Sequence, residues 1–190
     1  IPALLGLKKN IINKKTEVFC SGSISLADRN YYCWKKGGHG KVNLKKAIKE
    51  SCDCYFYELA KKINIDDLSE LATDLGLNNI YNIGLSNAQK GLIPNKKWKK
   101  SNLEQGWYQG ETLITAIGQG YNLTSPLQLA ILYSALLNGG RFPSPKLIKN
   151  EPSKYLGEEL NPNDQKAILN ALKAAVQEPS GTAYKLNLDN

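Results

Sequence analysis

The histidine and the four cysteines of this 190-residue chain all lie between Cys20 and Cys54. Three of the thiols and the imidazole follow the spacing Cys20-x12-Cys33-x5-His39-x12-Cys52. Zn²⁺ binds four nitrogen or sulfur ligands in a tetrahedron, and three cysteines with one histidine form one of its common structural sets. The spacing therefore predicts a metal site in this part of the chain.

Disulfides are the competing interpretation, because four cysteines in an oxidising compartment often pair. Cys52 and Cys54 are two residues apart and cannot easily bond to each other. Glycines on both sides of His39 let the backbone approach closely, which favours the metal over the disulfides. Cys54 is then a spare thiol. The sequence leaves both alternatives open.

A second chemical signal overlaps the first, because Cys52 lies inside the triplet Ser51-Cys52-Asp53. Taken alone, Ser51 and Asp53 are most simply a helix cap, a role that both residue types commonly fill. A triad of Ser51, His39 and Asp53 is disfavoured, because it would take the histidine that the cysteines need.

The triplet is predicted to lie at or near the junction of two helices. Asn43 suits the N-cap of a helix over residues 44–50, and apolar residues from Tyr55 to Ile63 follow at helical spacing. Residues 16–41 precede these helices and are rich in Gly, Ser and aromatic residues. That composition indicates a loop that needs an external staple, which zinc would supply.

Other helices are predicted from apolar periodicity and from Pro or Gly at their ends. Residues 1–7 resemble the tail of a helix, and further helices are expected over residues 66–75, 126–138 and 164–176. Residues 78–110 combine much turn chemistry with little periodicity, so we expect a long surface excursion there. The chain is thus expected to be mainly α, with few strands.

Composition indicates one globular domain or two small lobes, since 42% of the residues are hydrophobic. No apolar run approaches the roughly 20 residues that span a membrane. The chain starts without a methionine or a signal peptide, so we expect it to be a piece of a longer protein. Any membrane anchor would then lie outside it.

The net charge of +8 is compatible with an anionic partner such as nucleic acid, a membrane surface or a cell-wall polymer. Only Arg29 and Arg141 are arginines, and lysine lacks the bidentate fork that reads guanine edges. Nucleic acid is therefore disfavoured. The basic stretch over residues 96–100 is expected to be a solvated loop with one buried tryptophan, Trp98.

Five motifs occur along the chain in a fixed order. They are Cys33-Trp34-Lys35-Lys36-Gly37-Gly38-His39-Gly40, Ala47-Ile48-x-x-Ser51-Cys52-Asp53-x-Tyr55-Phe56-Tyr57-x-Leu59-Ala60, Trp107-x-x-Gly110-Glu111-Thr112, Gly118-Gln119-Gly120-Tyr121, and Ser125-Pro126-Leu127-Gln128-Leu129-Ala130. Together they resemble the transpeptidase domain of the penicillin-binding protein 2 family, the class B penicillin-binding proteins of bacterial cell elongation. The resemblance runs in register from Ile1 to Ala183 and includes Asn138-Gly139-Gly140 and Gly181-Thr182-Ala183.

The resemblance implies an α+β parent fold of the serine β-lactamase and DD-peptidase type, an antiparallel sheet flanked by helices. Residues 1–190 would form part of the transpeptidase domain, mostly its helical lobe. The implied activity is crosslinking of peptidoglycan stem peptides through a serine acyl-enzyme, with β-lactams acylating the same serine. The implied setting is a periplasmic domain anchored in the inner membrane, with a glycosyltransferase of the elongation machinery as partner.

The resemblance also implies roles for the triplet and for the cluster of cysteines and histidine. Ser51-x-Asp53 looks like the second of three motifs at such sites, in which the serine helps to pass a proton to the leaving amine. Asp53 would hold that network and contact substrate. Some members carry zinc at positions that correspond to Cys20, Cys33, His39 and Cys52. The metal would be structural and would fix the second motif against the preceding loop.

Neither Ser-x-x-Lys nor Lys-Thr-Gly occurs in the sequence. By resemblance, the nucleophile and its lysine would lie shortly before Ile1, and the third motif shortly after Asn190. The chain alone is therefore expected to be inactive. Two alternatives stay open: a non-catalytic, zinc-stapled helical module that binds a partner or an anionic polymer, and a penicillin-sensing receptor on the same fold.

Overall fold

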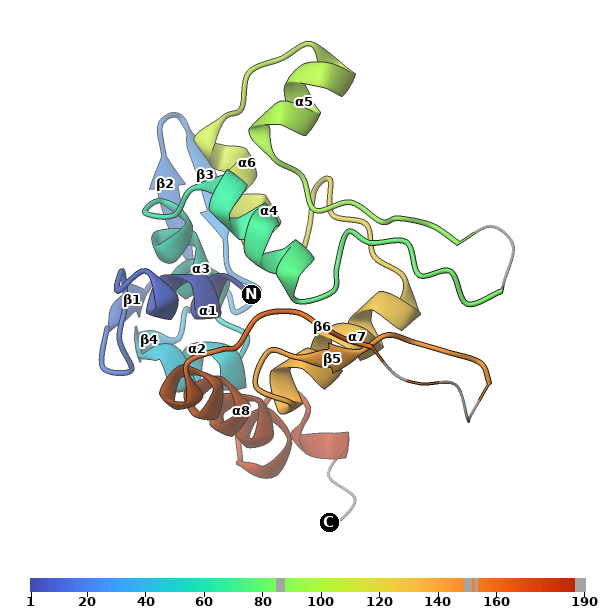
Figure 1. Ribbon diagram of the computed structural model, residues 1–190. Helices are drawn as coiled ribbons and strands as arrows, with labels where there is room; N and C mark the ends of the chain where they lie inside the picture. Colours follow the sequence, from blue (N-terminus) through green and yellow to red (C-terminus); the bar gives the residue numbers. More distant parts are fainter. Residues whose placement is uncertain (85–87, 149–151, 153, 187–190) are drawn as a thin grey trace.

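The computed structural model describes residues 1–84, 88–148, 152 and 154–186. Figure 1 shows a group of helices with short strands at its margins. In chain order the elements are α1 (Pro2–Lys8), β1 (Val18–Cys20), β2 (Ser23–Leu26), β3 (Arg29–Tyr32), β4 (Gly40–Val42), α2 (Leu44–Lys49), α3 (Asp53–Ala60), α4 (Ile65–Asp74), α5 (Lys96–Leu103), α6 (Gln109–Ala116), α7 (Pro126–Leu137), β5 (Phe142–Pro143), β6 (Tyr155–Leu156), α8 (Pro162–Gln177) and the 3-10 turn η1 (Tyr184–Leu186).

Helix α3 lies at the centre of the fold and begins at Asp53, the last residue of the triplet that the sequence singles out. It contacts α1, α2, α6 and the strands β1, β2 and β3. Its side chains are mostly apolar and face inward, and the buried ones are Cys54, Tyr55, Tyr57, Leu59 and Ala60. Because this burial removes apolar surface from water on several sides, the N-terminus of α3 has a fixed place in the core.

The helices predicted from periodicity are confirmed, with small shifts at their ends. The side chain of Asn43 accepts a hydrogen bond from the backbone of α2, as predicted for an N-cap. Ser125 begins α7 with a capping box, and Pro126 occupies its first turn. Helix α3 ends at Ala60, so Ile63 lies beyond it.

The expectation of an irregular loop over residues 16–41 is wrong in part, because the segment contains four short strands. Antiparallel pairing joins β1 to β4, with Val18 opposite Val42, and β2 to β3 in a hairpin. Ala27 has a positive φ of 50° at the hairpin turn. The strands are three or four residues long, too short for an alternating pattern to stand out in sequence.

The expectation of a long surface excursion over residues 78–110 is wrong in part, because the segment holds α5 and the start of α6, whereas its described residues before α5 form no helix. The basic stretch forms α5, which Asn95 caps. Lys99 rather than Trp98 is its buried residue, with an exposed fraction of 1%. Its ammonium pairs with Glu111 at 2.5 Å and lies 4.4 Å from the Tyr108 ring centroid. Sequence patterns treat lysine as a surface residue, so this buried pair could not be foreseen.

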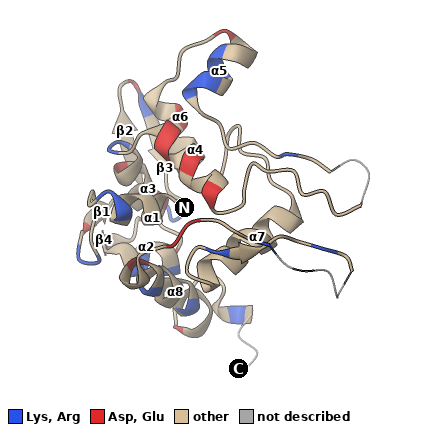
Figure 2. Ribbon diagram, viewed as in Figure 1, with Lys and Arg blue, Asp and Glu red and all other residues tan. Residues whose placement is uncertain are grey.

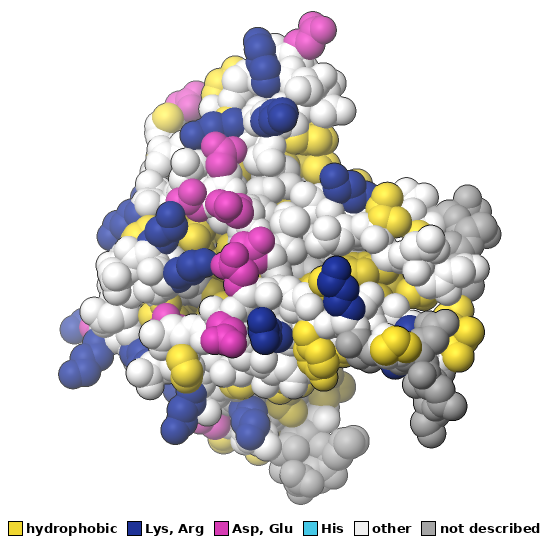
Figure 3. Space-filling view, viewed as in Figure 1, with side chains coloured by type: hydrophobic (Ala, Val, Ile, Leu, Met, Phe, Trp, Pro, Cys, Tyr) yellow, Lys and Arg dark blue, Asp and Glu magenta, His cyan; other side chains and the backbone are white. Residues whose placement is uncertain are grey.

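Charged side chains of both signs are spread over the surface. Lysines and arginines occur on α5, α8 and several loops, whereas acidic residues line part of α4 (Figure 2). The face in Figure 3 mixes both signs with apolar side chains. Within the described ranges, no helix is both long enough and apolar enough to cross a lipid bilayer.

Candidate metal centre and active-site motif

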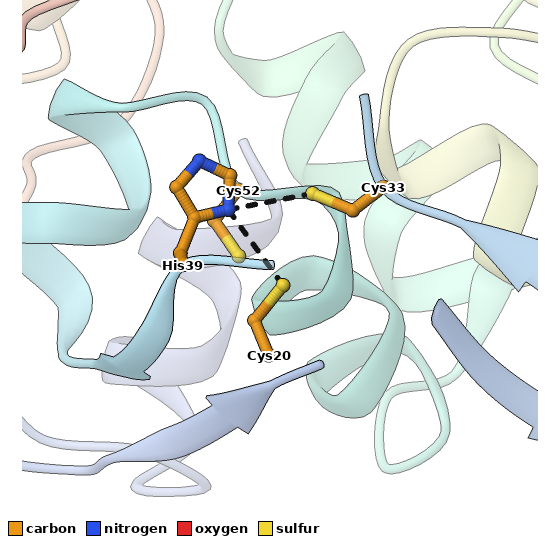
Figure 4. A group of neighbouring side chains, drawn as sticks. All are labelled: Cys20, Cys33, His39 and Cys52. Atoms are coloured by element: carbon orange, nitrogen blue, oxygen red, sulfur yellow. Dashed lines mark hydrogen bonds between the residues drawn. The ribbon is translucent and has the colours of Figure 1, made fainter. Parts of the chain in front are cut away.

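The structure brings the four predicted metal ligands together. Cys20, Cys33, His39 and Cys52 are all buried, and their ligand atoms lie within 4.8 Å of one another (Figure 4). His39 Nδ1 is 3.6 Å from the Cys20 Sγ and 3.5 Å from the Cys33 Sγ. A tetrahedral zinc with Zn–S of about 2.3 Å and Zn–N of about 2.0 Å would place sulfur and nitrogen about 3.5 Å apart. The geometry of the cluster therefore fits a tetrahedral metal.

Four separate pieces of the chain supply these ligands. Cys20 ends β1, Cys33 follows β3, His39 precedes β4, and Cys52 is the N-cap residue of α3. The backbone in this region is closely packed, because a side chain at Gly38 would clash with the carbonyl of Cys20. This close approach explains the glycine before His39, whereas Gly40 after it has open space around it and a positive φ of 67° that favours glycine.

A lysine of α2 holds the backbone of His39 in place. The Lys46 ammonium donates hydrogen bonds to the backbone carbonyls of His39, at 2.7 Å, and of Lys41, at 3.2 Å. The histidine backbone is thereby tied to the helix that leads into the triplet.

The electrostatics of the cluster favour a thiolate at Cys20. Burial raises the pKa of the Cys20 thiol, but hydrogen bonds from His39 and Gly22 outweigh it and lower that pKa to about 6. Burial, together with the charge of neighbouring thiolates, raises the pKa of Cys52 and of Cys54. A bound cation would favour thiolates at the ligand positions, since thiolate is the form that binds metals.

None of the four cysteines forms a disulfide, and Cys54 lies outside the ligand set. The imidazole Nδ1 faces two thiols rather than Ser51. The structure therefore does not form the triad of Ser51, His39 and Asp53.

Ser51 closes the end of α2 in an unusual backbone conformation. The Cys52 N–H bonds the Ala47 carbonyl at 2.9 Å, and the Ser51 N–H bonds the Ile48 carbonyl at 3.4 Å. This is the pattern of a Schellman motif, in which the residue after the C-cap has a positive φ and is usually glycine. Ser51 holds that position with a φ of 52°. The chain keeps a serine where glycine would be less strained.

Separate contacts hold the two polar members of the triplet. The Ser51 hydroxyl lies 3.0 Å from the hydroxyl of Thr182, which follows α8. The Asp53 carboxylate accepts a hydrogen bond of 2.9 Å from the backbone N–H of Trp34, and the Trp34 indole bonds the Glu50 carbonyl. With Cys52 in the cluster, each residue of the triplet is fixed by a different part of the chain.

Ser51 and Asp53 both line a cavity of about 340 Å³. Its remaining wall is largely apolar and comes from α1, α2, α3, α6, α7 and α8. The triplet thus places two polar side chains at the edge of an apolar recess, an arrangement suited to binding and acid-base chemistry on a ligand.

Sequence reasoning did not identify Trp34 or Thr182 as partners of the triplet. Both stand in quoted motifs, but Trp34 acts on Asp53 through its backbone N–H, which no side-chain pattern encodes. Thr182 lies 131 residues from Ser51 along the chain, and only folding brings them together.

Comparisons with known proteins show the family to which the chain belongs. The model of the penicillin binding protein transpeptidase domain matches residues 1–189. Peptidoglycan D,D-transpeptidase MrdA of Salmonella typhimurium is 32% identical, over 96% of this chain and 32% of its own length. The solved PBP2 of Helicobacter pylori is 34% identical with a TM-score of 0.87, over 96% of this chain and 35% of that chain, and it has also been solved in complex with MreC. Pseudomonas aeruginosa PBP2 in complex with WCK 5153 is 31% identical with a TM-score of 0.89, over 100% of this chain and 46% of that one.

The chain belongs to the penicillin-binding protein transpeptidase domain family. The resemblance and the fold class inferred from the sequence are thereby confirmed, and the described residues are mainly helical, with short antiparallel strand pairs. The chain spans about a third of the length of the curated relative it matches.

Proposed function

We propose that this chain is part of a peptidoglycan D,D-transpeptidase of bacterial cell elongation that acts through a serine acyl-enzyme and is acylated by β-lactams. The observation that carries the proposal is the triplet Ser51-Cys52-Asp53, anchored on three sides at the edge of a recess in a transpeptidase-family fold. Relatives named D,D-transpeptidase MrdA support the same reaction class.

In the proposed reaction, the serine hydroxyl of a Ser-x-x-Lys motif attacks the carbonyl carbon of a D,D-peptide bond in a stem peptide. The serine proton passes to the lysine of that motif and then, through Ser51, to the leaving amine. The peptide bond breaks as the ester forms. An amino group of a second stem peptide then attacks the ester, and the serine recovers its proton, so no oxidant or reductant is needed. Asp53 would hold the network and contact substrate.

Zn²⁺ is the metal that we propose for Cys20, Cys33, His39 and Cys52. The donor set of three sulfurs and one nitrogen suits zinc and disfavours hard cations such as Mg²⁺. All four positions would be filled by protein ligands, so the ion would brace the triplet rather than activate water. Metal analysis of the reductively purified protein is expected to give about one equivalent of zinc, and less than about half an equivalent would contradict the assignment.

The same proposal covers the setting of the protein. Peptidoglycan stem peptides and β-lactams would be its ligands, and a glycosyltransferase of the elongation machinery its partner. The complex of the Helicobacter pylori relative with MreC supports membership in a larger assembly. We propose a periplasmic location with an anchor in the inner membrane.

The experiment is labelling by a fluorescent penicillin, followed by a crosslinking assay. The protein that contains this chain together with Ser-x-x-Lys and Lys-Thr-Gly motifs is expected to take one label and to join stem peptides. The isolated 190-residue chain is expected to take none, because it lacks the nucleophile. Labelling without crosslinked product would favour the penicillin-sensing receptor, and no labelling would favour the non-catalytic module.

A further inference from the structure

The segment that follows α8 is tied to α2, the helix that ends just before the triplet. The Glu178 carboxylate pairs with Lys45 at 2.5 Å and with Lys49 at 3.5 Å. The Ser180 hydroxyl donates to the Glu50 carboxylate at 2.9 Å. Helix α2 also packs against α8 (Figure 1). The two segments are therefore held in one arrangement.

Thr182 is the residue of this segment that reaches the triplet itself. Its backbone N–H donates to the Lys49 carbonyl at 3.0 Å, which fixes its main chain. Its hydroxyl lies 3.0 Å from the Ser51 hydroxyl and 3.5 Å from the same Lys49 carbonyl. The threonine side chain thus stands between Ser51 and a backbone acceptor.

The Ser51 hydroxyl needs such a partner. Ser51 is exposed, and its rotor has staggered positions of similar energy unless a neighbour selects one. Its backbone is fixed by the Schellman hydrogen bonds, but these do not involve the side chain. The hydroxyl of Thr182 is the hydrogen-bond partner that the structure gives to the Ser51 hydroxyl.

A second hydroxyl suits a relay better than a fixed donor or acceptor would. A hydroxyl carries one donor and two acceptor lone pairs, and its hydrogen rotates to suit its neighbours. Thr182 can accept from Ser51 while donating to the Lys49 carbonyl, or it can donate to Ser51. Ser51 can therefore first receive and then release a proton without moving its oxygen.

We propose that Thr182 is a positioning residue for transpeptidation, which holds the Ser51 hydroxyl in place while that hydroxyl changes between acceptor and donor. This inference rests on the proposed function. It assigns a role to Gly181-Thr182-Ala183, and it links the segment after α8 to the second active-site motif.

The test compares acylation rates in the protein that contains this chain together with Ser-x-x-Lys and Lys-Thr-Gly motifs. Thr182→Val keeps the side-chain shape and the backbone N–H but removes the hydroxyl, whereas Thr182→Ser keeps the hydroxyl. We expect T182V to lower the second-order rate of labelling by fluorescent penicillin about tenfold, or about 1.4 kcal/mol at 25 °C. T182S is expected to stay within about twofold of the wild type. Thr73→Val removes another threonine hydroxyl, which bonds only within α4, and serves as the matched control.

A double-variant cycle separates positioning from a general loss of structure. If Thr182 acts through Ser51, T182V lowers the rate in the wild type but not further in a Ser51→Ala background. The same tenfold loss in both backgrounds would overturn the inference, as would wild-type rates in T182V. If the wild-type protein takes the label, either of these two results leaves the proposed function intact. A wild-type protein that takes no label would refute the proposed function and this inference with it.

Discussion

Ser51 occupies a backbone position that favours glycine, and this conflict gives a sharp prediction about stability and activity. Its φ of 52° lies in the left-handed region, where a residue with a Cβ costs roughly 1–2 kcal/mol relative to glycine. Glycine gives back about 0.5–1 kcal/mol of this through its larger entropy in the unfolded chain. We therefore expect Ser51→Gly to be about 1 kcal/mol more stable than Ser51→Ala.

The two variants isolate the backbone contribution because both lose the same hydroxyl. A difference of about 1 kcal/mol corresponds to roughly 2–4 °C in the unfolding midpoint of a domain of this size. Thermal unfolding of the zinc-loaded protein that contains this chain is the assay, with wild type, S51A and S51G measured side by side. Both variants are expected to show acylation rates lowered to the same extent, because neither carries the hydroxyl that is proposed to relay the proton.

The result that would refute the reasoning is an S51A protein as stable as S51G. It would mean that the left-handed conformation carries no strain at this position. If penicillin instead acylates S51G faster than S51A, backbone strain at position 51 rather than the hydroxyl governs the acylation rate. We predict that S51G is more stable than S51A and is acylated no faster, as expected where function keeps a strained residue.

Three further predictions follow from other contacts. Removing zinc with a chelator under reducing conditions is expected to lower the unfolding midpoint by about 10 °C, because a metal at about 1,000 times its Kd stabilises the folded state by about 4 kcal/mol. Cys33→Ser should lower the midpoint by a similar amount, because it removes one ligand. Lys99→Met removes the cationic partner of Glu111, whose carboxylate keeps hydrogen bonds from the Tyr108 N–H and the Tyr121 hydroxyl, and it should cost about 1.5–3 kcal/mol by denaturant unfolding. The exposed Lys97→Met should stay within about 0.5 kcal/mol. A hydrogen bond from Lys45 lowers the pKa of Glu178 below its ordinary value of 4.5. The stability that the ionised Glu178 contributes is therefore present above pH 4.5 and is lost as the pH falls through the lower pKa of the folded state. Glu178→Gln should remove this part of the acid dependence of the unfolding midpoint.

The metal ligands show how much of the site could be predicted from residue types. Three cysteines and one histidine at regular spacing identified the set that the structure brings within 4.8 Å. The position of the triplet between α2 and α3 was likewise predicted, since Asn43 and the apolar spacing after Cys52 are local signals. Assigning roles to Ser51 and Asp53 needed the family resemblance as well.

The buried pair of Lys99 with Glu111 shows what local pattern could not provide. Lysine and glutamate are both typical of a solvated surface, and the pair forms only when the fold brings Lys99 of α5 to Glu111 of α6. The β1 and β4 strands were missed for a similar reason, because each is three residues long and its partner is distant in sequence.

The sequence by itself determined which atoms can bind a metal, where several of the helices lie, and to which family the chain belongs. Only the tertiary structure decided what holds each member of the triplet: Thr182 beside Ser51, the cluster around Cys52, and the Trp34 backbone on Asp53. The physical reason is that ligand chemistry and helix caps are properties of neighbouring residues, which a linear pattern records. Contacts across 131 residues and a left-handed serine depend on the packing of whole helices, which no local pattern encodes.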